Sequence, residues 1–168
     1  MLEPAAIRTC AVLTLAAFGA GANATFAVDG RTSTSSIVVA TIQPRNGAPG
    51  YSWLRIYFYP SALSADDNAA ATQGRVAAIG AKWTAVLQFT LDKASTVWQV
   101  DLSLPGHTCT VAETDRDAGN ALQDFQFDGK NLRLRTKGTH VCDMTSLGIP
   151  NQTFAWDVDL ATSVANAR

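Results

Sequence analysis

The sequence contains no apolar run long enough to cross a membrane as a helix. Its longest uncharged apolar stretch, Cys10–Ala20, falls well short of the roughly 20 residues that such a helix needs. Charge of one sign is also lacking, because 13 Lys and Arg oppose 14 Asp and Glu, for a net charge of −1. Nucleic-acid-binding domains usually carry a clustered excess of Lys and Arg. We therefore expect no nucleic-acid partner. We also expect no stable membrane insertion of the mature chain, meaning the chain that remains after removal of an N-terminal signal peptide.

Residues that perform acid–base catalysis are scarce. A Ser-His-Asp catalytic triad would have to use one of the two histidines, His107 or His140, and no nucleophile-elbow pattern accompanies them. Glu113 is the only glutamate beyond the first few residues, and it lies in a polar segment. A glycosidase acid usually sits in an apolar pocket that raises its pKa. We therefore expect no cofactor, favour a protein without catalytic activity, and keep a small secreted hydrolase as an alternative.

The N-terminal region is typical of a secretory signal peptide. Arg8 precedes the apolar stretch, and Ala22–Ala24 provides the small-x-small pattern that signal peptidase accepts. We expect residues 1–24 to be removed, or cleavage after Ala22 if Ala20–Ala22 is the site that is used. The sequence thus predicts a periplasmic or secreted protein whose residues 25–168 form a single domain.

Cysteine is rare, with three residues in the whole chain. Removal of Cys10 with the leader leaves Cys109 and Cys142, for which one intramolecular pairing exists. A disulfide persists outside the cytoplasm. Closing a loop of about 34 residues should stabilise the fold by roughly 3–4 kcal/mol on the chain-entropy model.

The mature sequence alternates short β-type runs with turn signals, at the spacing typical of sandwiches and barrels. The expected strands are Ser36–Gln43, Tyr51–Tyr59, Thr84–Leu91, Thr96–Leu104, His107–Val111, the hairpin around Asp128–Asn131, and Phe154–Leu160. We expect an all-β fold, an antiparallel β-sandwich of the immunoglobulin-like or jelly-roll-like type with about 7–9 strands.

One short connecting helix is expected near residues 64–73. Ser64 can cap it, Asp66 and Asp67 fall in its positively polarised first turn, and Gly74 can end it.

The strongest expected strand carries the candidate ligand-binding residues. Side chains alternate along a strand, so one face carries Tyr51, Trp53, Arg55, Tyr57 and Tyr59. The opposite face is sufficient to build a core. An exposed aromatic face would form a rigid platform for a carbohydrate or a protein. If the strand is instead buried on both sides, Arg55 needs a carboxylate partner.

Two matching triplets carry residue types that bind zinc. His107-Thr108-Cys109 and His140-Val141-Cys142 each place a histidine beside a cysteine, and two histidines with two thiolates suit tetrahedral zinc. If the cysteines face each other across antiparallel strands, the histidines lie roughly 13 Å apart at 3.3 Å per residue. Oxidation also removes the thiolates. We therefore interpret the histidines as neighbours of a disulfide and expect no metal.

An acidic segment is the alternative metal candidate, for calcium. Its possible ligands alternate around Gly119 and are Asp115, Asp117, Asn120 and Asp124. Gln126 stands at the twelfth position, where calcium loops place a bidentate carboxylate, and Arg116 lies inside the segment. A solvated loop is the better interpretation.

These observations favour an extracytoplasmic, non-catalytic binding module whose ligand is an unidentified protein or carbohydrate. A subunit of a larger cell-envelope assembly is the alternative, and it requires an unpaired sheet edge or apolar patch that a partner completes.

Overall fold

The computed structural model describes residues 22–145 and 148–167, so most of the expected signal peptide lies outside the described residues. The strands are β1 (Asn23–Val28), β2 (Arg31–Ser35), β3 (Ile37–Pro44), β4 (Ser52–Tyr59), β5 (Ala85–Leu91), β6 (Val97–Leu104), β7 (His107–Ala112), β8 (Asp124–Phe127), β9 (Asn131–Cys142) and β10 (Gln152–Asn166). The helices are α1 (Ala65–Thr72), α2 (Val76–Ile79) and α3 (Asp115–Ala121). None of the helices in this part of the chain is long and apolar enough to span a membrane.

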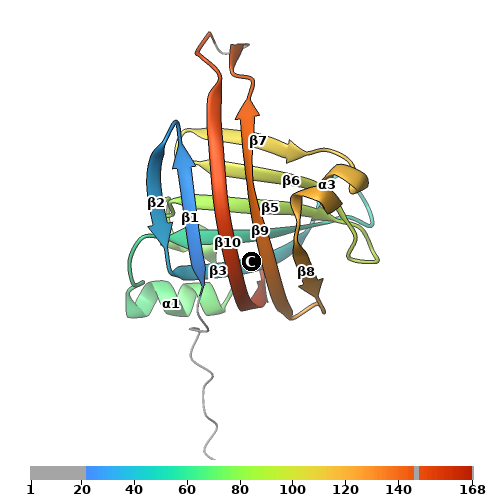
Figure 1. The fold of residues 1–168 in the computed structure, drawn as a ribbon. Helices are drawn as coiled ribbons and strands as arrows, with labels where there is room; N and C mark the ends of the chain where they lie inside the picture. The colour runs from blue at the N-terminus through green and yellow to red at the C-terminus, as the bar shows by residue number, and fades with distance from the viewer. Residues whose placement is uncertain (1–21, 146–147, 168) are drawn as a thin grey trace, which may run out of the picture.

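The strands form one curled, mixed sheet that folds over on itself. Its order is β2-β1-β10-β3-β4-β5-β6-β7, and β9 and β8 continue from β10 as a branch. Figure 1 shows β2, β1, β10, β9 and β8 as a front layer whose strands run across those of a back layer, β3 to β7. The all-β expectation is confirmed.

Strand β10 joins the two layers. It pairs antiparallel with β1 and β9, and its last residues, Val164–Asn166, pair in parallel with Ala40–Ile42 of β3. The expected sandwich was purely antiparallel and had fewer strands. The difference arises because one long strand, which changes partner near its end, connects both layers.

The core fills the space between the layers. Side chains alternate along a strand, so the expected strand Phe154–Leu160 should bury one face, and Phe154, Trp156, Val158 and Leu160 are indeed buried. Back-layer side chains from β4 and β5 meet them, and an edge-to-face contact between the rings of Phe26 and Phe58 spans the layers at 4.9 Å.

Helix α1 agrees with the prediction. The Ser64 hydroxyl accepts a hydrogen bond from the Asp67 amide at 3.1 Å, and Gly74, with φ of +70°, follows the helix. Together with α2, α1 covers one end of the outer side of the back layer, where Tyr59 and Ile79 belong to a small second core.

Helix α3 corrects the prediction of a solvated acidic loop. Residues 115–121 are helical, and the Thr114 hydroxyl accepts a hydrogen bond from the Asp117 amide at 3.2 Å. Thr114 therefore acts as an N-cap that turns the acidic residues into the first turn of a helix.

The N-terminal hairpin of β1 and β2 was not predicted. Asp29 and Gly30 form its tight turn with positive φ angles of 47° and 80°. Asn23 and Ala24 already pair with Asp159 and Val158, and Ala24 is buried. Cleavage after Ala24 would remove the first two residues of β1, whereas cleavage after Ala22 leaves the strand whole.

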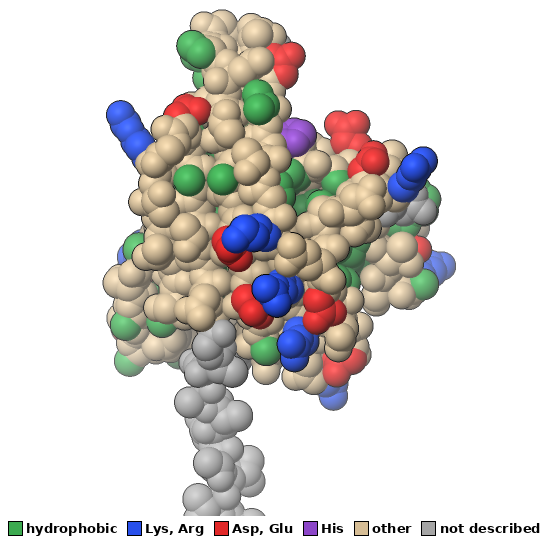
Figure 2. Space-filling view, viewed as in Figure 1, with side chains coloured by type: hydrophobic (Ala, Val, Ile, Leu, Met, Phe, Trp, Pro, Cys, Tyr) green, Lys and Arg blue, Asp and Glu red, His purple; other side chains and the backbone are tan. Residues whose placement is uncertain are grey.

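Charged side chains on the front layer are mixed in sign (Figure 2). Lys137 lies 2.6 Å from the Asp157 carboxylate, and Arg133 lies 3.1 Å from that of Asp124. Such exposed pairs contribute little stability, since water screens them. This face carries no surface of a single sign.

Candidate functional site

Four of the five aromatic-strand candidates share one face of β4, Tyr51 directly precedes this strand, and the five differ in environment. Leu54, Ile56 and Phe58 point into the core, so the candidates lie on the outer face of the back layer. Tyr51, Trp53, Arg55 and Tyr57 are half-buried. Tyr59 is 1% exposed in the second core beneath α1 and α2, and burial raises its pKa to about 12. The structure therefore separates Tyr59 from any surface ligand.

A row of polar side chains crosses the back layer beside Trp53. The Arg55 guanidinium stacks over the Trp53 ring at 4.7 Å and donates through Nε to the Gln88 side chain at 2.7 Å. Gln88 donates to Asp101 at 3.3 Å, and Thr110 donates to Asp101 at 2.7 Å. The partner of Arg55 is thus an amide, and one residue from each of β4 to β7 forms a continuous hydrogen-bonded row.

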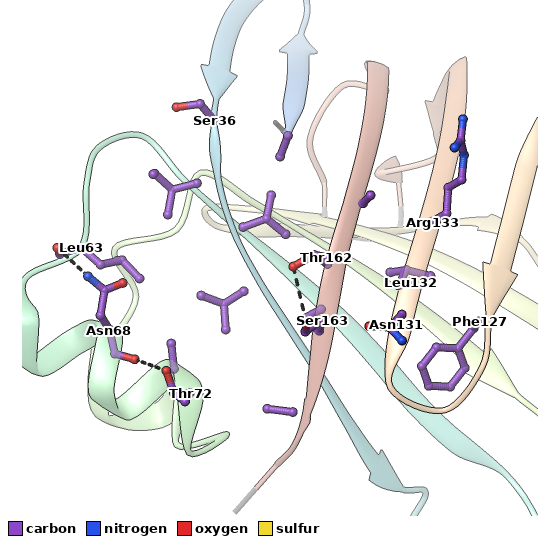
Figure 3. A pocket seen from close by; sticks show the side chains of 18 of the residues that line it. Ser36, Leu63, Asn68, Thr72, Phe127, Asn131, Leu132, Arg133, Thr162 and Ser163 are labelled. Atoms are coloured by element: carbon purple, nitrogen blue, oxygen red, sulfur yellow. Dashed lines mark hydrogen bonds between the residues drawn. The ribbon is translucent and has the colours of Figure 1, made fainter. Parts of the chain in front are cut away.

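A groove of about 1140 Å³ lies along the edges of β3 and β10, and we call it the edge groove. Figure 3 shows Asn68 and Thr72 of α1 on one side, and Asn131, Leu132 and Phe127 from β8 and β9 on the other. Its lining is mostly aliphatic or small, with hydroxyl and amide groups among the apolar side chains. Such a lining suits binding better than acid–base chemistry.

One wall of the edge groove is an open edge of β10. Within the described ranges, β1 pairs with β10 only as far as Asp159, and β3 pairs with it only from Val164. The Val164 amide donates to Lys130 at 2.7 Å, so even-numbered residues of this stretch direct their backbone groups toward β9. Because this direction alternates along a strand, the N–H and C=O of Ala161 face the groove.

The opposite wall is an open edge of β3. The Thr84 amide donates to the carbonyl of Phe58, so odd-numbered residues of β4 direct their backbone groups toward β3. Their partners in β3 are also odd-numbered, which leaves the N–H and C=O of Val38 directed toward β10. The described part of the chain therefore has two facing strand edges with no strand between them.

Sequence reasoning missed this groove. Its walls consist of small and β-branched residues that look like any other strand, and a gap in long-range pairing leaves no local signal. The segment 161–166 also lacks the strict alternation of apolar residues that revealed the rest of β10.

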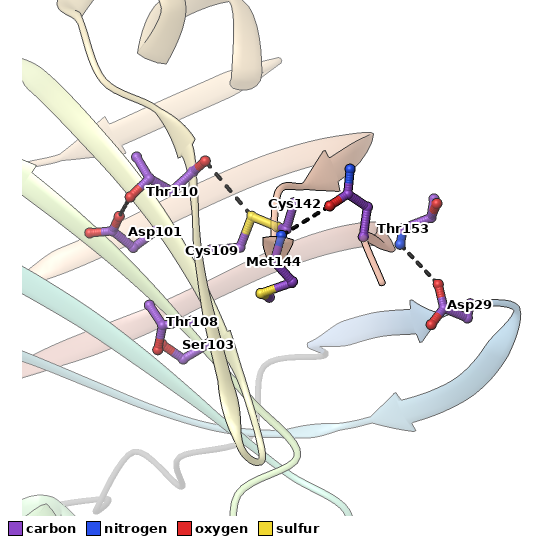
Figure 4. The surroundings of a disulfide bond; sticks show 10 residues. Asp29, Asp101, Ser103, Thr108, Cys109, Thr110, Cys142, Met144 and Thr153 are labelled. Carbon is purple, nitrogen blue, oxygen red and sulfur yellow. Dashed lines mark hydrogen bonds between the residues drawn. A yellow bond between two sulfur atoms is a disulfide. The ribbon is translucent and has the colours of Figure 1, made fainter. Parts of the chain in front are cut away.

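The predicted disulfide is present between Cys109 and Cys142, with a Cα–Cα distance of 6.0 Å (Figure 4). It ties β7 of the back layer to β9 of the front layer. These strands are not ladder neighbours, so the separation of roughly 13 Å expected between the two histidines, which assumed paired antiparallel strands, does not apply. Nδ1 or Nε2 of His140 and both sulfur atoms lie within 4.8 Å of one another.

The calcium candidates are not brought together. Asp115 and Asn120 belong to α3, the Asp117 carboxylate accepts from the Thr114 hydroxyl at 2.8 Å, and Asp124 is engaged by Arg133. Among the described residues, the one group of three His, Cys, Asp or Glu side chains close enough to hold a metal is Cys109, His140 and Cys142.

The acid that lines the edge groove is held in its ionised form. Hydrogen bonds from the side chain and backbone of Asn131, and from the amide of Lys130, lower the pKa of Asp128 to about 2. This carboxylate stabilises the turn between β8 and β9 and cannot supply a proton near neutral pH.

Comparison with protein-family models, with curated proteins and with solved structures finds no match for this chain.

Proposed function

We propose that the processed chain is an extracytoplasmic, non-catalytic binding module whose ligand is an extended segment of polypeptide laid in the edge groove. The carrying observation is that the backbone groups of Val38 and Ala161 face the groove with no strand partner among the described residues. An exported chain that starts at Asn23 has no further residues that could extend β1 along this edge.

The unpaired backbone groups at the two strand edges favour a peptide over an acyl chain as the ligand. Both ligands can fill a groove with an aliphatic lining, but a hydrocarbon would exclude water from Val38 and Ala161 without offering hydrogen bonds. An unpaired buried backbone group costs about 1–3 kcal/mol. A strand that adds to an exposed sheet edge satisfies these groups and uses alternate side chains for specificity. The partner can be another subunit of a cell-envelope assembly, as the alternative from the sequence requires.

A peptide selected from a displayed library of dodecapeptides, using the chain that starts at Asn23 as bait, tests the proposal. The matched control is the same peptide N-methylated at alternate residues, which keeps its side chains but removes one row of N–H donors. We expect the methylated form to bind at least about tenfold more weakly, equivalent to 1.4 kcal/mol. Equal affinity of both forms, or groove binding by decanoate while no peptide is selected, would contradict it.

The outer face of the back layer is a second candidate, for a carbohydrate. The observation that favours it is the half-buried Trp53 ring beside the ordered row of Arg55, Gln88 and Asp101, since sugars pack on aromatic rings and bond to amides and carboxylates. Glycan-array binding that is lost in Trp53→Ala would support this candidate. Binding of the selected peptide should be unchanged in the same variant, which separates the two surfaces.

A further inference from the structure

The disulfide and His140 form a cluster of three potential metal ligands at the junction of the two layers. Cys109 comes from β7, whereas His140 and Cys142 come from β9, where they are two residues apart and share the face that carries Leu132 and Leu134. The two cysteines are 7% and 4% exposed, and His140 is half-buried. The histidine is therefore the most solvent-accessible of the three residues.

The distances fit a tetrahedral ion once the sulfur–sulfur bond is opened. Zn²⁺ holds thiolate sulfur at about 2.3 Å and imidazole nitrogen at about 2.0 Å, so neighbouring ligand atoms lie roughly 3.5 Å apart. The three ligand atoms of the cluster already lie within 4.8 Å of one another. A rotation of the two cysteine side chains suffices to separate the sulfur atoms, and the strands need not move far.

Reduction supplies the required ligands. A dithiol, which is oxidised to its own disulfide, or a phosphine, which takes an oxygen atom from water and becomes a phosphine oxide, donates two electrons to the Cys109–Cys142 bond. The two sulfur atoms take up two protons and become thiols. Each thiol releases its proton to solvent as its sulfur binds the metal, because the thiolate is the ligand form. An imidazole nitrogen of His140 donates a lone pair, and a water molecule can complete the fourth position.

We propose that reduction of the Cys109–Cys142 disulfide creates a Zn²⁺ site formed by Cys109, His140 and Cys142. The layers are then tied together under oxidising conditions by the disulfide and under reducing conditions by the metal. The contacts that carry the site are independent of the edge groove, which lies along β3 and the end of β10.

Cobalt titration of the processed chain, before and after phosphine reduction, tests the proposal. Co²⁺ bound to thiolates in a tetrahedral site absorbs visibly, with a sulfur-to-metal charge-transfer band in the near ultraviolet. We expect one equivalent to bind to the reduced protein only, and Zn²⁺ to displace it. His140→Gln should weaken binding at least about tenfold, since even second-shell changes reach that size. Thr139→Gln, on the opposite face of β9, should bind as the parent does.

Far-ultraviolet circular dichroism keeps the test decisive. Reduced protein that remains folded yet shows no cobalt bands would overturn the proposal, as would His140→Gln binding with the parent's affinity. Reduced protein that unfolds and does not regain its spectrum with Zn²⁺ would also overturn it, because a site spanning two layers must favour the folded chain. The oxidised His140→Gln variant serves as the folding control, since it retains the disulfide.

Discussion

Gly74 should be the glycine least tolerant of alanine, because it lies where the chain leaving α1 meets the end of β10. Its φ is +70°, and an added Cβ would overlap the carbonyl oxygen of Asn166. Left-handed backbone costs a non-glycine residue about 1–2 kcal/mol. The added Cβ would overlap main-chain atoms, which cannot rotate away as a side chain can. The last residues of β10 must therefore shift.

That shift would disturb the pairing of β10 with β3, which joins the two layers. The Ala167 amide donates to the carbonyl of Ile42 at 2.9 Å, next to the three parallel pairs between β10 and β3. Loss of two such hydrogen bonds costs about 2 kcal/mol. Together with the backbone strain, Gly74→Ala should lower the free energy of unfolding by about 3–4 kcal/mol.

Gly30→Ala is the matched control. Gly30 also has a positive φ, +80°, but an added Cβ meets nothing within 4 Å. Only the conformational term of about 1–2 kcal/mol applies to it. Urea denaturation followed by tryptophan fluorescence should therefore rank Gly74→Ala below Gly30→Ala by about 2 kcal/mol. Equal destabilisation of the two variants would refute the described contact between the α1 exit and β10.

Other expectations follow from the same structure. N-terminal sequencing of the exported protein should find Asn23 first, because a start at Thr25 shortens β1; an intact Met1 would contradict export. Cys109→Ser and Cys142→Ser should each cost about 2–5 kcal/mol in denaturant titrations, and by similar amounts, since either removes the same disulfide. Hydrogen bonds from Asn131 lower the pKa of Asp128 from 3.8 to about 2, so its contribution to stability is present above pH 3.8 and is lost toward pH 2. Asp128→Asn should lose less Tm over that interval than the parent, and an equal loss would argue against the hydrogen-bonded turn.

The parts of the fold that were predictable are those with a local signal. The alternation of Phe154 to Leu160 marked one buried face, and the cap of α1 was visible in Ser64 and its neighbours. The pairing of Cys109 with Cys142 followed from the expectation that Cys10 is removed with the signal peptide. The Thr114–Asp117 cap of α3 was equally visible but was obscured by the interpretation of the acidic residues as loop ligands.

What failed depended on long-range pairing. Trp98 lies in the expected strand Thr96–Leu104, but an irregularity in register near Leu91 brings Val97 inward and leaves Trp98 39% exposed. The distance between the two histidines was worked out for neighbouring antiparallel strands, whereas β7 and β9 lie in different layers. The edge groove exists because β1 and β3 leave a stretch of β10 unpaired, which no local pattern of residues specifies.

Amide hydrogen exchange at Ala161 and Val38, measured by NMR on the chain that starts at Asn23, tests the central claim most directly. In the free protein these amides should exchange faster than that of Thr162, which faces β9. Saturation with the selected peptide should slow both, while Thr162 stays protected throughout. Protection of Ala161 and Val38 in the free chain, or fast exchange at both in the peptide complex, would contradict a strand-accepting groove.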